Sequence, residues 1–245
     1  MNSKYVSPFP TLNFPSLAST NKPNNLVHEA HHEDMNWWLD SSREDEFKNC
    51  PHINIYSGSS CFLDQKLKKL HTESPIARLD ETAGESSRTE HWEDYDNVVV
   101  LAEHPYLLYA SSTTNNKIPI GFIQFNLSIR YYDFEKTISV ICNIERIYAA
   151  KKNRCQHVGA ALIFATAEVV QKHCEDILSQ CNIMPKSYPT IEALEITLYA
   201  ELHSKEGENM LLLLNSKLEL FKDDFEMENE GGKVRIKGIE LDVGF

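Results

Sequence analysis

Apolar residues crowd three consecutive stretches in the middle of the chain, and many of them are β-branched or aromatic. The stretches cover residues 97–111, 118–134 and 136–149. Each is read as a strand because β-branched and aromatic residues favour extended backbone. The connections Ser-Thr-Thr-Asn-Asn-Lys and Asp-Phe-Glu-Lys are short and typical of turns. Since strands joined by short turns pair antiparallel, the pattern predicts a three-stranded meander.

The period of the apolar positions then changes to that of a helix. A long helix is expected to begin near Val158 or Gly159 and to be followed by a strong strand over residues 191–203. Strand, helix and strand in this order predict a crossover that joins parallel strands. A second helix is expected over residues 204–218, with Ser204 as its N-cap.

Hydrophobic patterns also predict elements before and after this series. Residues 53–58 are read as a short strand, and residues 59–73 as a helix. The tail over residues 220–243 is read as two strands around a Glu-Gly-Gly turn, which makes a C-terminal hairpin. The sequence therefore predicts an α/β fold of the α+β kind, in which helices pack on a mixed sheet that is antiparallel first and parallel afterwards.

The first fifty residues differ from the rest in composition. Residues 1–50 are rich in Pro, Asn, Ser and His and show little periodicity, which predicts an N-terminal arm that is loosely ordered or wraps over the domain. Residues 51–245 then form the single domain. His28 and His32 have a spacing that suits metal ligands on a helix. No third ligand is positioned with them, so a solvated polar stretch is favoured and no metal is expected.

Charge and cysteine content narrow the class of protein. The chain has 245 residues and a formal net charge of -12, which argues against a nucleic-acid binder because such a protein needs a basic face. Its six cysteines show no C-x-x-C spacing and are read as reduced thiols. No signal-peptide pattern and no apolar run of membrane-spanning length occur. We therefore expect a soluble, cytoplasmic protein without a membrane partner, and a homodimer stays open.

The turn before the long helix carries the first candidate chemistry. Gly159, Ala160 and Ala161 have almost no side chain, so an anion can come close to the unpaired amides of the first helical turn. The helix dipole adds partial positive charge there, and Lys151 and Arg154 precede the turn. Alternatively, the small residues only permit a tight turn and close packing of helix on sheet. These residues alone leave both interpretations open.

A family resemblance adds to the anion-binding interpretation. Six consecutive residues resemble the Q/R-x-x-G-x-G/A signature of the GCN5-related N-acetyltransferase (GNAT) superfamily: Gln156, His157, Val158, Gly159, Ala160 and Ala161. The order of strands and helices from about residue 52 onward is similar to the fold of that superfamily. The resemblance implies a GNAT-like acyl-CoA N-acyltransferase fold, with acetyl-CoA as co-substrate and direct acetyl transfer to a primary amine.

The resemblance also implies roles for the turn and the strand before it. The amides of those six residues would hold the pyrophosphate of acetyl-CoA. The end of the strand, at Ala149, Ala150 and Lys151, would line the pantetheine arm and the thioester. In the family this strand parts from the next one, here residues 194–202, so that a free N–H polarises the thioester carbonyl. Lys151 departs from the apolar residue that the family often has there.

Glu145 is the candidate general base. It is a lone carboxylate on an apolar strand, and a glutamate at this place resembles the base of histone-acetylating family members. Burial would raise its pKa toward values useful for accepting a proton from an amine. Alternatively, Glu145 forms an ion pair with Arg146, with Arg130 or with a lysine on a neighbouring strand.

The candidate general acid is less well defined. The family commonly uses a tyrosine in the last helix, and Ser216 stands at that position here. Ser216 is therefore a weak donor candidate, and the thiolate can also leave without an acid. Tyr148 is a further candidate on the strand before the turn, with Tyr199 and His203 as lesser ones on the next strand.

No sequence motif identifies the acceptor substrate. The acidic stretches 80–97 and 222–230 suit a cationic substrate such as a polyamine, a peptide N-terminus, a lysine or an aminoglycoside, although solvated faces are favoured. We expect an acetyl-CoA-dependent N-acetyltransferase that acts on an amine-bearing small molecule, peptide or protein. Two rivals stay open. One is a catalytically degenerate GNAT-like domain that serves as a CoA-binding or protein-interaction module, and the other is a protein- or tRNA-acylating toxin.

Overall fold

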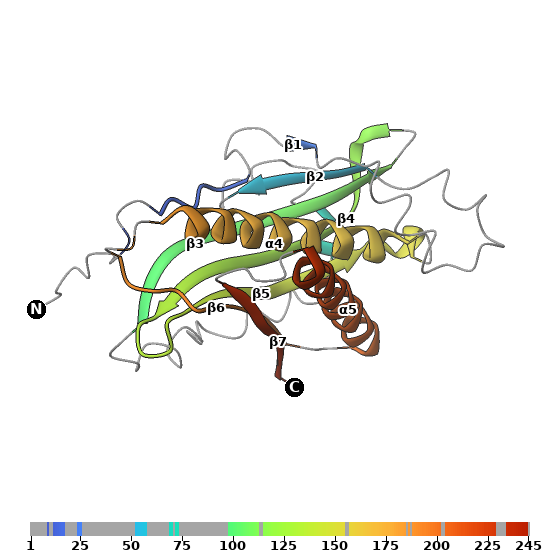
Figure 1. Cartoon of the computed structure of the whole chain (residues 1–245). Coiled ribbons are helices and arrows are strands. Elements are labelled where there is room, and N and C mark those ends of the chain that lie inside the picture. Colours follow the sequence, from blue (N-terminus) through green and yellow to red (C-terminus); the bar gives the residue numbers. More distant parts are fainter. Residues whose placement is uncertain are drawn as a thin grey trace, which may run out of the picture.

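A computed structural model of the chain describes residues 9, 12–17, 24–25, 52–57, 69–70, 72–73, 98–112, 115–154, 157–184, 186, 188–201, 204–228 and 234–244. The strands among them form one mixed sheet, in which neighbouring strands follow in sequential order from β1 to β7 (Figure 1). The strands are β1 (Asn24–Asn25), β2 (His52–Ser57), β3 (Val98–Ser112), β4 (Asn115–Tyr132), β5 (Thr137–Ala149), β6 (Ala193–Glu201) and β7 (Arg235–Gly244). The long helices are α4 (Val158–Ile183) and α5 (Lys205–Glu228), and a short 3-10 helix, Lys151–Asn153, precedes α4.

The central strands confirm the predicted meander. β3 pairs antiparallel with β4, and β4 pairs antiparallel with β5. Side chains of β4 alternate as the apolar pattern requires. Ile123, Phe125 and Leu127 are buried in the main core, whereas Gln124 and Asn126 point to the opposite face of the sheet. The short strand predicted at residues 53–58 is confirmed as β2, while most of the helix predicted over residues 59–73 lies outside the described residues.

The predicted crossover is confirmed as well. β5 and β6 pair in parallel, and α4 connects them. Helix α4 begins at Val158, as expected, and its buried face carries most of the apolar residues of the segment. At the next connection, the backbone N–H of Gly207 donates to Ser204 Oγ at 3.1 Å, so Ser204 caps α5 as expected.

The predicted C-terminal hairpin is wrong. α5 continues to Glu228 instead of ending near residue 218, and β7 is a single strand that pairs in parallel with β6. Packing explains the longer helix, because Leu214, Leu218, Phe221 and Phe225 recur at helical spacing and contact the core. Since α5 carries the chain back along the sheet, β7 enters parallel to its neighbour.

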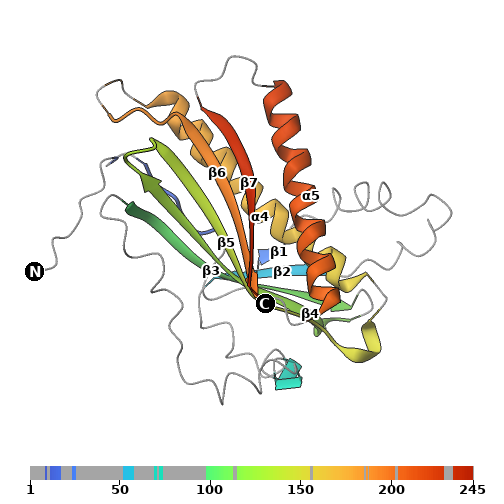
Figure 2. The ribbon, with the colours of Figure 1, turned by 90° about the horizontal axis from the view of Figure 1, so that it is seen from below.

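Both long helices cover the same face of the sheet, so the fold has two layers (Figures 1 and 2). The main core lies between these layers and joins side chains of β3 to β7 with the inner faces of α4 and α5. A smaller apolar cluster lies on the other face of the sheet, which we call the helix-free face because neither α4 nor α5 covers it; the cluster contains Leu70, from a short helical stretch, together with Leu107, Phe122, Tyr148 and Ala150. None of the helices described has the length and hydrophobicity that crossing a membrane demands.

Part of the N-terminal arm packs against the domain. Phe9 and Phe14 are buried, and the Phe9 ring meets the Tyr131 ring edge-on at a centroid distance of 4.7 Å. Asn13 and Gln180 of α4 exchange two hydrogen bonds of 2.9 Å, one from the Asn13 N–H to Oε1 and one from Nε2 to the Asn13 carbonyl. Residues 9 and 12–17 therefore act as a strap over β4 and α4.

A buried polar network holds this strap to the sheet. The hydroxyl of Tyr106 lies 2.8 Å from His173 Nε2 on α4 and accepts a hydrogen bond from the backbone N–H of Leu17. His104 stacks on His173 at 5.3 Å, and its Nε2 lies 2.8 Å from the carbonyl oxygen of Phe14. Burial, and to a smaller extent the neighbouring His104, lower the pKa of His173 to about 4. The pKa of His104 is also lowered by burial.

The buried histidines make stability dependent on pH. A histidine whose pKa falls from 6.5 to about 4 on folding stabilises the protein fully above pH 6.5, and this stabilisation is lost as the pH falls through that window. The free energy of unfolding falls by about 3 kcal/mol from the upper to the lower end of this pH window. Chemical denaturation at about pH 7.5 and about pH 4.5 should show this loss in the free energy of unfolding.

His173→Gln is the matched variant, because glutamine can still accept a hydrogen bond from Tyr106 but does not titrate. Most of the pH dependence of the free energy of unfolding in this window should disappear in that variant. If the free energy of unfolding changed with pH as steeply as in the wild type, His173 would not be the group responsible.

Candidate functional site

A β-bulge in β5 is the irregularity around which the candidate site is built. Phe125 of β4 pairs with Ile144, but the next residue, Gln124, pairs with Arg146. Glu145 is therefore an extra residue without a partner position on β4. Beyond the bulge, the alternation of β5 is reversed, since Ile144 and Ile147 both pack toward the core. Bulges bend the strand that carries them, so the end of β5 is redirected at Glu145.

The bulge coincides with the point at which β5 and β6 part. Their parallel pairing runs from Thr137 and Ala193 to Ile144 and Ala200, and no pair follows among the residues that the structure describes. β5 nevertheless continues to Ala149, on the β4 side of the sheet. The last part of β5 thus lies beside a gap in the sheet instead of a hydrogen-bonded neighbour.

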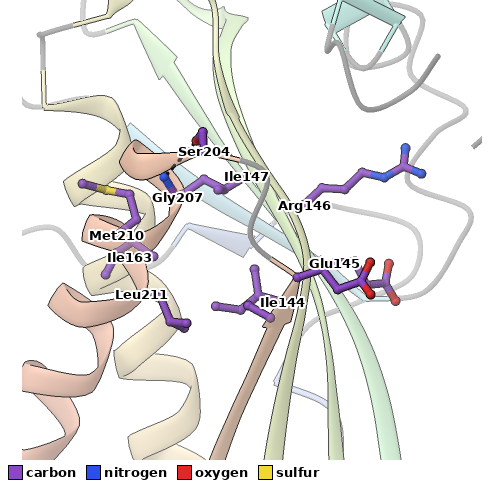
Figure 3. A pocket seen from close by; sticks show the side chains of 11 residues that line it. Ile144, Glu145, Arg146, Ile147, Ile163, Ser204, Gly207, Met210 and Leu211 are labelled. Atoms are coloured by element: carbon purple, nitrogen blue, oxygen red, sulfur yellow. Dashed lines mark hydrogen bonds between the residues drawn. The ribbon is translucent and has the colours of Figure 1, made fainter. Parts of the chain in front are cut away.

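A pocket opens at this gap, between the ends of the two strands and the start of α5 (Figure 3). It has about 520 Å³ of empty space, part of which is open to solvent. Its walls are mainly apolar and consist of Ile144, Glu145, Arg146, Ile147, Ile163, Ala200, Glu201, Ser204, Gly207, Met210 and Leu211. In Figure 3, Ile144 points toward the helices, whereas Glu145 and Arg146 point to the other side of the strands.

Glu145 is the best-defined ionisable group of the pocket. The side-chain amide of Gln124 donates a hydrogen bond from Nε2 to Glu145 Oε2. Although the residue reaches solvent, desolvation raises the pKa of its carboxyl group, and the hydrogen bond from Gln124 opposes this by a smaller amount. In the part of the chain that the structure describes, Glu145 forms no ion pair, so its neighbour is an amide and not Arg146 or Arg130.

The start of α4 has no side-chain cap, a feature that it shares with helix starts that bind anions. His157 precedes the helix with φ 56 and ψ 14, in the left-handed region, and no side chain caps the helix. The first turn holds no acidic residue. A left-handed residue followed by a helical one turns successive N–H groups toward one concavity, which favours anions. Lys151 and Lys152 are exposed in the 3-10 helix just before this turn.

Gly159 has a packing role at the same place. A Cβ added there would lie 3.1 Å from Met210 Sδ, so the missing side chain lets α5 approach the first turn of α4. Met210 also lines the pocket and therefore connects the pocket to the start of α4. The two interpretations of Gly159 are compatible, because one small residue can serve helix packing and leave the amides accessible.

The other expected site residues divide into three groups. Ala149 is the last residue of β5 and Ala150 follows it, and neither lines the pocket; the Ala150 N–H donates to the Ile120 carbonyl of β4 at 2.9 Å. Tyr148 does not line the pocket and instead packs on Phe122 in the cluster on the helix-free face. Ser216 lies outside the pocket too, and its hydroxyl donates to the Leu212 carbonyl at 2.9 Å. Gln156 and His203 lie outside the described residues.

Several pocket residues were not expected from the sequence. Ile163 on α4, together with Gly207, Met210 and Leu211 on α5, forms the wall that faces β5. Their apolar spacing signals only a helix face, and helix faces usually pack into a core. The sole local signal is Gly207, which is unusual inside a helix because glycine weakens helices.

Comparison with known proteins gives no family assignment. No protein-family model matches the chain, and no curated protein matches it. The site is therefore interpreted from its own geometry. Among the described residues, no three His, Cys, Asp or Glu side chains gather as metal ligands.

Gly121 of β4 sets how closely the start of α4 can approach the sheet. A Cβ at this position would lie 2.5 Å from Val158 Cγ1 and 2.9 Å from the carbonyl oxygen of Tyr148. Gly121→Ala should therefore reduce the free energy of unfolding by about 1–3 kcal/mol, measured by urea denaturation. Gly238→Ala on β7 is the control, since nothing lies within 4 Å of a Cβ there. Equal stability of the two variants would contradict the proposed contact.

Proposed function

We propose that the chain is an acetyl-CoA-dependent N-acetyltransferase of the GNAT kind, which transfers an acetyl group directly to a primary amine. One observation carries the proposal. The parallel strands β5 and β6 part at a bulge, and the pocket at this gap is connected through Met210 to the uncapped start of the helix that joins them. Such a gap, next to a helix start, accommodates a long ligand with an anionic end and an apolar arm.

The anionic end would be the pyrophosphate of acetyl-CoA. The amides of Val158 and Gly159 are the donors for it, because the first N–H groups of a helix have no partner within the helix. Lys151 and Lys152 add positive charge in an acidic chain. The side chain of Met210 is flexible and can make room at Gly159.

The thioester end would lie in the pocket. The apolar side chains of Ile144, Ile147 and Met210 suit the pantetheine arm and a small acyl group. Beyond Ile144, β5 forms no strand pair with the described residues of β6, so its backbone N–H groups on that side are candidate donors. Such a donor stabilises the negative charge that develops on a carbonyl oxygen under attack.

The chemistry then needs a group that accepts a proton. The nitrogen lone pair of the amine attacks the thioester carbon, the C–N bond forms, and the C–S bond breaks. The amine loses one proton to Glu145, whose raised pKa suits this role. The CoA thiolate leaves and takes its proton from solvent, because neither Ser216 nor Tyr148 lines the pocket. Holding both reactants in one cleft supplies much of the acceleration.

A second candidate function is a CoA-binding or protein-interaction module without catalysis. The observation that favours it is the absence of both expected acid candidates, Ser216 and Tyr148, from the pocket lining. Met210 also packs close to Gly159, at the proposed phosphate position. Binding of acetyl-CoA without turnover of any primary amine would favour this module over the enzyme.

Substitution at Gly159 tests the phosphate position. Gly159→Glu places a negative charge where the pyrophosphate is expected, and Gly159→Gln has nearly the same volume without the charge. We expect acetyl-CoA binding, measured by isothermal titration calorimetry, to be abolished by glutamate and weakened less by glutamine. Thermal unfolding of both variants controls for disturbance of the Met210 contact. Equal affinity of the two variants would show that phosphate does not bind at this turn.

Substitution at Glu145 tests the proton acceptor. A base with a raised pKa must lose its proton to work, so kcat/KM for an amine should rise with pH through that pKa. Glu145→Gln should lower kcat/KM by about 10²–10⁴-fold and remove this rise, while the affinity for acetyl-CoA stays the same. A pH–rate profile that keeps its shape in the variant would assign the base elsewhere.

A further inference from the structure

The N-terminal strap, residues 9 and 12–17, meets the domain at one buried hydroxyl group. Tyr106 Oη lies 3.0 Å from the backbone nitrogen of Leu17, 3.4 Å from Ser16 Oγ and 2.8 Å from His173 Nε2. A tyrosine hydroxyl has one proton to donate and two lone pairs that accept. All three contacts are therefore made at once when the hydroxyl accepts from Leu17 and Ser16 and donates to an unprotonated Nε2 of His173.

A positive charge on His173 disturbs this arrangement. Nε2 then becomes a donor, so the hydroxyl of Tyr106 must turn its own proton toward Ser16, across the longer distance of 3.4 Å. The charge also lies beside His104, whose ring stacks on the ring of His173 at a centroid distance of 5.3 Å. His104 Nε2 lies 2.8 Å from the carbonyl oxygen of Phe14, so both imidazoles are tied to the strap, one directly and one through Tyr106.

The surroundings of His173 offer no negative charge to compensate a proton. The described strap residues are all uncharged, and β4 sets two apolar residues, Phe125 and Leu127, opposite the residues of β3 in this contact. Burial raises the pKa of the Cys142 thiol in β5 and of the Cys174 thiol in α4, so both stay neutral. The charged residues next to His173 on α4 are exposed: Lys172, Glu175 and Asp176. Among the described residues, no carboxylate forms an ion pair with either histidine.

We propose that His104, Tyr106 and His173 form an acid-sensitive latch, and that protonation of the histidines releases the strap while the sheet stays folded. This inference is independent of the proposed acetyltransferase activity. Release gives the imidazoles access to water, in which their charged form is more stable. The latch contacts are made to side chains and not to the strand ladder, because β4 is already paired with β3 on one side and with β5 on the other.

At neutral pH the strap stays bound because both histidines are uncharged. Phe9 and Phe14 then remain buried, and Asn13 keeps its two hydrogen bonds with Gln180 of α4. Burial lowers the pKa of the latch histidines, to about 4 in the case of His173. A histidine with a pKa of 6.5 when released and about 4 when held favours the held strap above this interval, and favours release as the pH falls through it.

Amide hydrogen exchange of the full chain, followed by NMR at about pH 7.5 and about pH 5, tests the release. The amides of Asn13 and Leu17 report on the strap, because each donates one of its hydrogen bonds. After correction for intrinsic exchange, their opening constant should rise about 30-fold between the two pH values, as expected for a pKa that moves between 6.5 and about 4. The paired amides of β4 should open far less often than the strap at pH 5. Equal opening constants for the strap and β4 would mean that only the whole fold opens, and would overturn the proposal.

Two variants assign the effect to the latch. His173→Gln keeps an acceptor for Tyr106 but does not titrate, so the rise of the strap opening constant should shrink to at most about threefold. Gln180→Met is the control, because it removes the side chain that bonds Asn13 and leaves both histidines in place. It should raise the opening constant by the same factor at both pH values and keep the full dependence on pH. The full rise in His173→Gln would overturn the proposal.

The ring nitrogens of His173 provide a test that needs no variant. Nitrogen NMR distinguishes protonated from unprotonated imidazole nitrogens. At about pH 7.5, Nε2 of His173 should be unprotonated and Nδ1 protonated, as the hydrogen bond donated by Tyr106 requires. On acidification, Nε2 should gain its proton in step with the loss of exchange protection at Leu17. A neutral ring with its proton on Nε2, or protonation of His173 without any change at Leu17, would overturn the proposal.

Discussion

The extra residue in β5 is the constraint on which the candidate site depends. A sheet gains its hydrogen bonds by pairing strands along their full length, and parallel strands such as β5 and β6 would ordinarily do so. The bulge at Glu145 redirects β5 just where its pairing with β6 ends at Ile144. Backbone groups, a carboxylate and an apolar wall then meet at one gap, which a regular sheet would not provide.

Close packing fixes the position of the helices around this gap. Gly121 brings the start of α4 onto the end of the sheet, and Gly159 lets Met210 of α5 approach the same turn. Both contacts leave little tolerance for an added methyl group. The start of α4 is thus held in place by its neighbours and not by a side-chain cap, so its first amides stay available.

Much of the fold could be predicted from the sequence, because the dense apolar runs of β3 to β5 and the long period of α4 are strong patterns. The end of α5 could not, since residues 219–228 are largely polar and only Phe221 and Phe225 tie them to the core. The hairpin interpretation followed the local Glu-Gly-Gly turn, whereas tertiary packing decided the outcome. Glu145 stood out as a lone carboxylate on an apolar strand, and the structure adds Gln124 as its partner.

The bulge itself had no local signal, because a strand with one extra residue has the same composition as one without it. The pocket wall on α5 could not be predicted from the sequence for a related reason. Met210 and Leu211 have the spacing of core residues, and only the gap in the sheet turns part of that helix face into a pocket wall. Tyr148 was a candidate general acid because it precedes the turn in the sequence. The reversed alternation after the bulge instead places its side chain on the helix-free face.

Residue-resolved amide hydrogen exchange, with and without acetyl-CoA, tests the central claim most directly. The account predicts rapid exchange, in the free protein, of those β5 amides beyond Ile144 that point toward β6, and of the first amides of α4. Acetyl-CoA should protect both sets together and leave the paired amides of β3 and β4 unchanged. Strong protection of the β5 amides in the free protein, or no response of either set to acetyl-CoA, would contradict the account.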